Sequence, residues 1–254
     1  MEWYLILAVI GAGFMAGFIN TLAGSGSLIT LPMLMFLGLP ANVANGTNRI
    51  AILLQNVVGV GSFRQQKVLN TKMGLWLAIP AVIGSLLGAQ IAIELNEEIM
   101  EKTIAILLIV MFFLILYKPQ RWIKGKAGHV EAKPSVFQFI IFFFIGIYGG
   151  FIQAGVGIFL LAGLVLSAGV DLVRANAMKL LIVLIYTPFA ITVFFMNNQI
   201  NWEYGLILAV GNMLGAFVAS RFAVNWGAKY VRYILLAVIL LSALKLLGVF
   251  EMIF

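Results

Sequence analysis

Residues 20–27 read N-T-L-A-G-S-G-S and interrupt an apolar run that extends from residue 3 to about residue 39. Glycine, serine, threonine and asparagine make a poor helix interior. The apolar sequence on both sides nevertheless places this stretch within the hydrocarbon of a membrane. Irregular backbone is tolerated there only where it is buried in protein or lines a polar cavity. The stretch therefore predicts a broken helix whose loop has a function.

The composition of the whole chain is that of a membrane protein. Its 254 residues are 63% hydrophobic and 10% charged, and the mean hydropathy is +1.10. Soluble domains are about half apolar and a quarter charged, and the strands of outer-membrane barrels alternate apolar with polar residues. We therefore expect an all-α, polytopic helical membrane protein. The net charge of +7 comes from cations in short loops and does not indicate binding to nucleic acid.

Eight apolar runs predict eight transmembrane segments. They are residues 3–39, 45–63, 73–93, 98–117, 136–168, 175–196, 204–223 and 231–249. A single crossing needs roughly 20 residues. The first and fifth runs are too long for one crossing, so each is expected to form a broken helical hairpin. The second break lies in the sequence Q-A-G-V-G-I of residues 153–158.

The two halves of the chain repeat each other. Residues 1–117 form the first transmembrane repeat, residues 135–254 form the second, and a basic linker, residues 118–134, joins them. An offset of 131 aligns Gly24 with Gly155, Gly26 with Gly157, Asn45 with Asn176 and Gly84 with Gly215. Asn20 aligns with Gln153 if the second loop is two residues shorter. Such matches are harder to attribute to chance than matches between apolar residues.

The positions of the basic residues predict the orientation of the repeats. Four loops contain 13 of the 16 Lys and Arg residues. All 13 lie on one side of the membrane if the first and fifth runs are hairpins, and the cation bias identifies that side as the cytoplasm. Each half then crosses an odd number of times, so the repeats are inverted. Both termini should be periplasmic, and the two hairpin loops can approach each other near mid-membrane.

The two loops carry groups suited to an anion. Helix N-termini expose free backbone N–H groups and a partial positive charge, and glycine lets the backbone approach a ligand. The candidate substrate-binding residues here are Asn20, Gly24, Ser25, Gly26, Ser27, Gln153, Gly155 and Gly157. Close packing of helices on small residues explains the glycines equally well. The matched positions of Asn20 and Gln153 favour a binding site.

Polar residues near the start of the second and sixth runs are further candidates. Asn45 and Asn176 are matched, and we interpret them as N-caps of the helices that follow as well as candidate substrate-binding residues. Asn48, Arg49 and Lys179 follow closely in the same runs and join the candidates. The two cations either snorkel toward the membrane surface or bind an anion.

Deeper in the same runs, Gln55 and Asn56 align with Tyr186 and Thr187. Uncharged polar residues in mid-span can bond to a neighbouring helix. Two consecutive ones at the same depth in both halves favour the wall of a polar cavity, so all four are candidate substrate-binding residues. Asn212 has no polar neighbour in its run, and we interpret it as a helix-packing residue.

The residues that the spans lack argue against several functions. No Asp or Glu lies well inside a span, whereas proton-coupled carriers commonly use a buried carboxylate or histidine. The chain has no cysteine, and its single histidine, His129, lies in the polar linker. We therefore expect no metal site, no metal-cation substrate and no cofactor. Without a Walker loop or a paired nucleophile and histidine, we expect no enzyme and assign no catalytic residue.

Two segments resemble the sulfite exporter TauE/SafE family, also called the toluene sulfonate uptake permease family. They are GFINTLAGSGSLITLPMLMFLGLPANVANGTNR, residues 17–49, and GGFIQAGVGIFLLAGLVLSAGVDLVRANAMK, residues 149–179. The resemblance covers nearly the whole chain. It implies an eight-span transporter of the bacterial inner membrane for sulfur-containing anions such as sulfite or organosulfonates. Family members commonly carry a run of glycines at the first loop, where this chain has Ser25 and Ser27.

Together these features predict a membrane transporter of a small sulfur-containing oxyanion, which works by alternating access around a mid-membrane site between the two broken helices. Two alternatives remain: an anion channel or facilitator with the same site, and a non-transporting membrane assembly subunit. Saturation and counter-flow distinguish a carrier from a channel. The expected partners are a small anionic substrate and the lipid bilayer, with a homodimer allowed and no nucleic acid.

Overall fold

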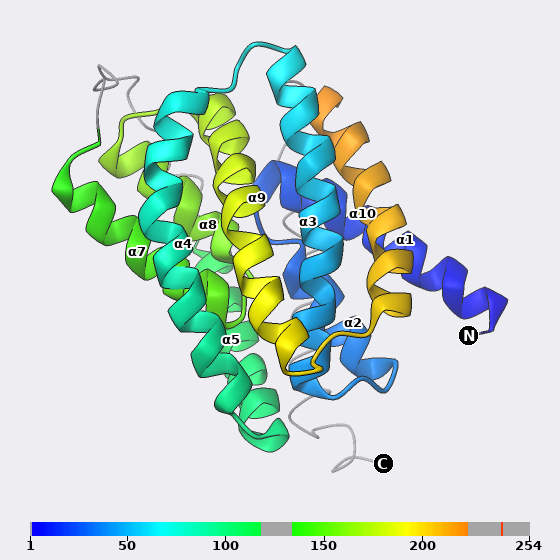
Figure 1. Cartoon of the computed structure of the whole chain (residues 1–254). Helices are drawn as coiled ribbons and strands as arrows, with labels where there is room; N and C mark the ends of the chain where they lie inside the picture. The colour runs from blue at the N-terminus through cyan, green and yellow to red at the C-terminus, as the bar shows by residue number, and fades with distance from the viewer. Residues whose placement is uncertain (1, 118–133, 223–239, 241–254) are drawn as a thin grey trace.

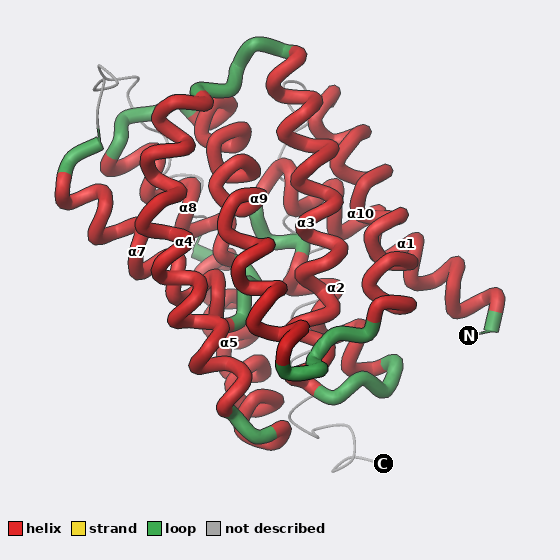
Figure 2. Tube along the Cα trace, viewed as in Figure 1, coloured by secondary structure: helices red, strands yellow, loops and turns green. Residues whose placement is uncertain are grey.

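The part of the chain that the structure describes is helical throughout (Figures 1 and 2). The computed structural model describes residues 2–117, 134–222 and 240. Within these ranges every regular element is a helix, which confirms the predicted all-α class. Nearly all of the predicted last span, residues 231–249, and all but the final residue of the predicted basic linker lie outside the described residues.

The helices follow the predicted runs closely. The first half contains α1 (Trp3–Ala23), α2 (Ser27–Phe36), α3 (Ala41–Gln65), α4 (Thr71–Glu94) and α5 (Glu97–Leu116). The second half contains α7 (Val136–Phe151), α8 (Val156–Ala162), the π-helical turn η1 (Gly163–Ser167), α9 (Leu172–Met196) and α10 (Trp202–Phe222). The first and fifth apolar runs are thus each divided into a longer helix and a shorter one.

Five of the described helices are long and apolar enough to cross a membrane, as judged by length and composition: α1, α4, α5, α9 and α10. Helix α3 has 25 residues, but polar side chains such as Arg49 and Asn56 make it less apolar. The helices α2, α7 and α8 with η1 are shorter. The chain is therefore a helical membrane protein, while the eight-segment inverted topology remains a prediction.

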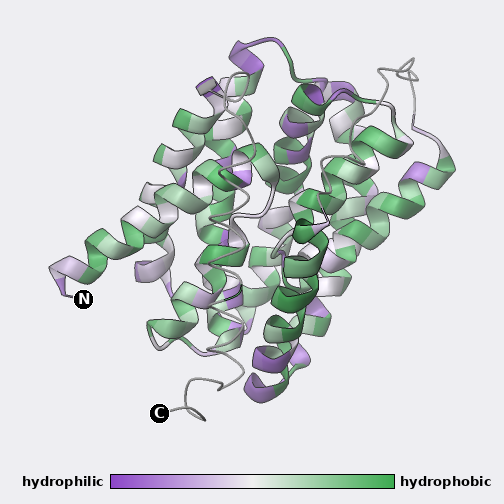
Figure 3. Cartoon of the chain, turned by 180° about the vertical axis from the view of Figure 1, so that it is seen from behind, coloured by the Kyte–Doolittle hydropathy of each residue, from purple (hydrophilic) through white to green (hydrophobic). Residues whose placement is uncertain are grey.

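The outer surface of the helices has the character expected for contact with lipid. Large apolar side chains such as Leu75, Ile79 and Ile83 of α4 are about half exposed, at 50%, 52% and 54%. Figure 3 shows apolar residues along the helices, with polar residues gathered mostly near the helix ends. In water such a surface would promote association, whereas hydrocarbon solvates it.

Both predicted helix breaks are present. Helix α1 ends at Ala23 and is followed by Gly24, which has φ +74°, and α2 begins at Ser27. Helix α7 ends at residue 151, and α8 begins after Gly155, which also has φ +74°. Glycine adopts this left-handed conformation without steric cost. A Cβ atom on Gly26 would lie 2.1 Å from the carbonyl oxygen of Ala16. The chain therefore turns back after the break and packs closely against α1.

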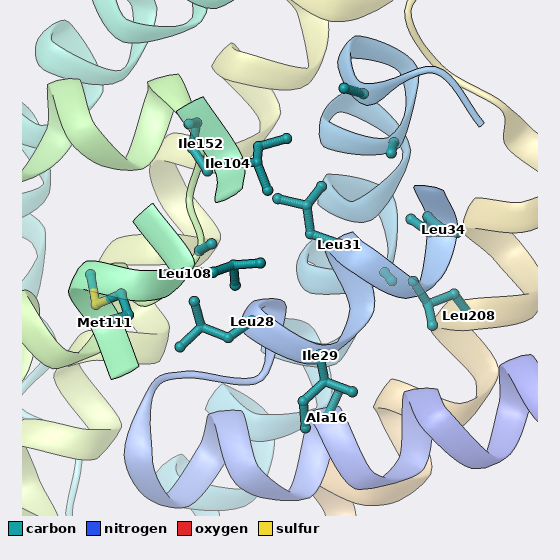
Figure 4. Packing of buried hydrophobic residues seen from close by; sticks show 14 of the residues in the cluster. Ala16, Leu28, Ile29, Leu31, Leu34, Ile104, Leu108, Met111, Ile152 and Leu208 are labelled. Atoms are coloured by element: carbon teal, nitrogen blue, oxygen red, sulfur yellow. The ribbon is translucent and has the colours of Figure 1, made fainter. Parts of the chain in front are cut away.

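An apolar cluster supports both breaks from one side (Figure 4). Leu28 and Leu31 of α2 are fully buried, as are Ile104 and Leu108 of α5 and Ile152 of the second break, each with an exposed fraction of 0% or 1%. Each buried aliphatic side chain contributes roughly 1.5–3 kcal/mol relative to an exposed one where water is the alternative solvent. Buried side chains of α5 therefore lie in one apolar cluster with those of α2 and of the second break.

Helices of one half pack against helices of the other, with α1 against α10 and α4 against α7. Gly84 and Gly215, which are matched in the sequence, make similar contacts. A Cβ atom on Gly84 would lie 2.1 Å from the carbonyl oxygen of Phe143, and one on Gly215 would lie 2.0 Å from that of Phe14. Backbones can approach this closely only where the side chain is a hydrogen atom.

Candidate functional site

The two helix breaks meet in the interior of the molecule. A Cβ atom on Gly157 would lie 2.3 Å from the Cα atom of Gly24, and one on Gly24 would lie 2.6 Å from the Cα atom of Gly157. The two loops are 133 residues apart in the sequence and still touch backbone to backbone. The predicted approach of the two glycine-rich loops is therefore observed.

A small enclosed cavity adjoins this contact. Its volume is about 10 Å³, roughly the space of one water molecule. Its polar lining comes from both halves and consists of Asn20, Ser27, Asn56, Gln153 and Lys179. Its remaining lining consists of Gly157 and the apolar side chains of Ile52, Val156, Leu180 and Val183. The structure thus brings together several of the predicted substrate-binding residues, from five separate segments.

The guanidinium of Arg49 binds the end of a helix in the other half. Its Nη1 atom donates to the carbonyl oxygen of Gly149 at 2.9 Å, and its Nη2 atom donates to those of Gly150 at 2.6 Å and Phe151 at 3.3 Å. These carbonyls belong to the last turn of α7, where helix carbonyls lack intrahelical partners and carry partial negative charge. Arg49 is fully buried, so the snorkelling interpretation is wrong for it.

Lys179 performs the corresponding task for the first half. Its Nζ atom donates to the carbonyl oxygens of Asn20 at 2.9 Å and Thr21 at 3.4 Å, in the last turn of α1, and to the Oδ1 atom of Asn176 at 2.9 Å. Its exposed fraction is 1%, so it does not snorkel either. Each half therefore supplies a buried cation that caps the broken helix of the other half.

The N-cap interpretation of Asn45 and Asn176 is wrong. Helix α3 begins at Ala41 after Pro40, and α9 begins at Leu172 after Asp171, so both asparagines lie about one turn inside their helices. The Nδ2 atom of Asn45 donates to the carbonyl oxygen of Phe151 at 2.7 Å, and that of Asn176 donates to the carbonyl oxygen of Leu22 at 3.4 Å. They assist the two cations in capping the broken helices.

Five other candidate side chains lie outside the cavity lining: Gln55, Thr187, Asn48, Ser25 and Tyr186. Gln55 accepts a hydrogen bond from Asn212 of α10 at 3.3 Å, which confirms that Asn212 packs helices together. The hydroxyl of Thr187 donates within its own helix to Val183 at 2.6 Å. Asn48 accepts from the hydroxyl of Thr30 at 2.6 Å, a partner that the sequence did not indicate because Thr30 stands alone among apolar residues.

The last two of the outlying candidates are Ser25 and Tyr186. Each has a buried hydroxyl without a hydrogen-bond partner. A Cβ atom on Gly149 would lie 2.8 Å from the hydroxyl oxygen of Tyr186, so this tyrosine lies against the last turn of α7. A Cβ atom on Gly155 would lie 2.9 Å from the side chain of Met111 in α5, so these two residues are in close contact. Tyr186 and Met111 therefore pack against the second break.

The electrostatic character of the site is cationic. Arg49 and Lys179 are buried, and every acidic side chain in the described ranges is at least partly exposed. The acceptors that surround the two cations are neutral oxygens of the backbone and of amide side chains. The same ranges contain no cluster of side chains that could hold a metal ion. The arrangement is suited to an anion.

A comparison with known protein families identifies the family of the chain. The model of the family described as Sulfite exporter TauE/SafE matches residues 9–246. The chain belongs to this family. No solved structure matches the chain significantly.

Curated relatives of this TauE/SafE family member are named as transporters. A probable membrane transporter protein, ORF9, from Sinorhizobium sp is 30% identical over 98% of this chain and 94% of its own length. The probable membrane transporter protein YfcA from Escherichia coli K12 is 27% identical over 96% of this chain and 90% of its own length. A further probable membrane transporter protein, from Haemophilus influenzae, is 25% identical over 90% of this chain. The family confirms the predicted class, a membrane transporter.

Proposed function

We propose that this TauE/SafE family member carries a small sulfur-containing oxyanion, sulfite or an organosulfonate, by alternating access around the cavity between the two helix breaks. The observation that carries the proposal is the pair of buried cations, Arg49 and Lys179, without a buried acid in the described ranges. Buried charges are normally paired. Helix dipoles at the ends of α1 and α7 offset about half a charge each, so the site retains positive charge for an anion.

Hydrogen-bond donors at the cavity support the same substrate class. The Nδ2 atom of Asn56 and the Nε2 atom of Gln153 are buried and have no partner, and both residues line the cavity. An unpaired buried donor costs about 1–3 kcal/mol. The oxygens of an oxyanion would accept from both donors, whereas a cation could pair only with the Oδ1 atom of Asn56 and would leave the Nε2 atom of Gln153 unpaired.

The size of the cavity supports a carrier over a channel. A volume of about 10 Å³ holds about one water molecule and is too small for sulfite, so binding requires the two breaks to separate. The breaks belong to different halves, and relative movement of the halves would change the side from which the cavity is reached. This is the logic of carriers whose site lies between discontinuous helices of two repeats.

The proposal that the anion contains sulfur rests on the description of the family, and binding to a panel of anions tests it. Purified protein would be exposed to sulfite, sulfate, thiosulfate, small sulfonates, carboxylates and phosphate while its melting temperature is measured. A ligand that binds only the folded state raises this temperature, by an amount that depends on the ratio of its concentration to Kd. We expect selective stabilisation by a sulfur oxyanion.

Two variants connect this result to the cavity. Lys179→Ala removes the cation, and Asn56→Leu removes an unpaired donor while keeping a side chain of similar volume. Both should abolish the stabilisation. Flux into proteoliposomes should saturate with anion concentration and show counter-flow, which a channel does not. Saturable, selective flux that survives both substitutions would overturn the proposed site.

A further inference from the structure

Gln153 has an unusual backbone for its residue type. Its φ angle is +65°, in the left-handed region that costs a residue with a side chain roughly 1 kcal/mol or more. The other non-glycine residues with positive φ in the described ranges are Lys67 and Asn198, and both lie in turns with exposed side chains. Gln153 is 2% exposed. The second break therefore holds a buried side chain in a costly conformation at the edge of the cavity.

The orientation of the Gln153 amide is determined by Arg49. Its Oε1 atom accepts a hydrogen bond from the Nη1 atom of Arg49 at 3.2 Å. A guanidinium has only donors, so the oxygen of the amide must face Arg49 and the NH₂ group must face away. That Nε2 atom is the buried donor without a partner, in a residue that lines the cavity.

Arg49 itself has little capacity left for a ligand. Its Nη1 and Nη2 atoms donate to Gly149, Gln153, Asn45, Gly150 and Phe151. Its Nε atom is buried without a partner, and Arg49 is not among the residues that line the cavity. The guanidinium also lies over the ring of Phe194, 4.6 Å from its centroid. It is held in place from several sides and acts on the cavity through Gln153.

At the first break, Lys179 does not orient a side-chain amide in this way. Lys179 bonds to the backbone carbonyl of Asn20 at 2.9 Å rather than to its side chain, so the amide of Asn20 is not oriented by a cation. The amide of Asn56 has neither its nitrogen nor its oxygen paired, and it can present either to a ligand. Among the amides at the cavity, Gln153 alone is restricted to donating.

We infer that Gln153 determines the selectivity of the site for anions, and that Arg49 is a positioning residue that holds its amide with the NH₂ group toward the substrate. The inference rests on the proposed function, because it assigns roles within the same site. It differs from the prediction made from the sequence, in which Arg49 itself contacts the anion.

The first test is Gln153→Glu in the full-length protein. This substitution keeps the length of the side chain and an oxygen for Arg49, but it replaces the donor at the cavity with a carboxylate oxygen. Kd for sulfite, measured from thermal shifts, should rise at least about tenfold, since a hydrogen bond to a charged group is lost. Gln65→Glu, at an exposed position at the end of α3, is the matched control and should leave Kd unchanged. An unchanged Kd in Gln153→Glu would overturn the inference.

The second test separates positioning from a general structural role. Arg49→Lys keeps the positive charge but loses the planar fork that bonds to several oxygens at once. It should raise Kd for sulfite about tenfold in the wild-type background and have almost no effect in a Gln153→Met background, because residues that act through one another are not additive. The same fold-change in both backgrounds would show that Arg49 acts independently of Gln153 and would overturn its positioning role.

Failure of the proposed function gives a different result from failure of this inference. If wild-type protein binds none of sulfite, sulfate, thiosulfate, small sulfonates, carboxylates and phosphate, the anion site itself is refuted. If wild-type protein binds sulfite and the double-mutant cycle shows no coupling, only the positioning role is refuted. Coupling between Arg49 and Gln153 together with a weakened Gln153→Glu variant supports both.

Discussion

The contact between the two helix breaks predicts a large effect from one added methyl group. In Gly157→Ala the new Cβ atom would lie 2.3 Å from the Cα atom and 2.4 Å from the carbonyl oxygen of Gly24. Carbon atoms rest at about 3.5 Å or more, so the loops would have to separate by about 1.2 Å. Both neighbours are backbone atoms and cannot rotate away. Overpacking of this kind costs typically 1–3 kcal/mol.

The assay combines stability with transport. For a chain of about this length, 1 kcal/mol corresponds to roughly 2–4 °C in melting temperature, so Gly157→Ala should melt about 2–12 °C below wild type. Sulfite flux in proteoliposomes should fall by more than the loss of folded protein explains, because the cavity lies beside the displaced loops. Gly11→Ala is the matched control, since no atom lies within 4 Å of its added Cβ atom.

The control should equal or slightly exceed wild type in stability, because alanine is favoured over glycine inside a helix by about 0.5–1 kcal/mol. Wild-type melting temperature and wild-type flux in Gly157→Ala would refute the reasoning, because they would mean that the two loops are not in contact in the working protein. A lower melting temperature with full flux would confirm that the two loops are in contact, but it would show that transport does not depend on this contact.

Three further predictions test other parts of the structure. Asp171 accepts hydrogen bonds from the backbone N–H groups of Val173 and Arg174 at the start of α9, so Asp171→Ala should lower the stability by about 1 kcal/mol. The melting temperature should fall while the affinity for the anion stays unchanged, and a reduced affinity would contradict this capping role. Thr187→Val should keep wild-type flux, since the hydroxyl bonds only within α9, and a loss of more than half the flux with normal expression would place Thr187 in the site. A tag inserted beside residue 128 should be labelled only from the cytoplasmic side, as the cation bias predicts; labelling from the periplasm would exclude the hairpin topology.

Much of the fold could be predicted because it depends on local sequence. Continuous apolar runs determine where helices form, and a cluster of glycine and small polar residues determines where a helix breaks. Gly24 takes a left-handed conformation just after α1, and Gly155 takes one just before α8; glycine adopts this conformation freely. The two breaks and the all-helical class therefore followed from the sequence.

Errors arose where the role of a residue depends on distant partners. The positions of Asn45 and Asn176 beside turn-like sequence predict helix starts, but their amides bond to carbonyls 106 and 154 residues away. The repeat alignment pairs Lys179 with Asn48 rather than with Arg49. The two cations nevertheless do the same work, because capping requires a donor at the helix end and not at one register position.

The sequence by itself determined that this protein is a helical membrane transporter of the TauE/SafE family, with two glycine-rich breaks and several polar residues within apolar runs. Only the tertiary structure decided which polar residues face one another. Arg49 and Lys179 each bond to helix carbonyls of the other half, and Gln153 and Asn56 are left with unpaired donors at the cavity. The reason is physical: burial leaves polar groups few partners, and the fold, rather than local sequence, sets which partners are within reach.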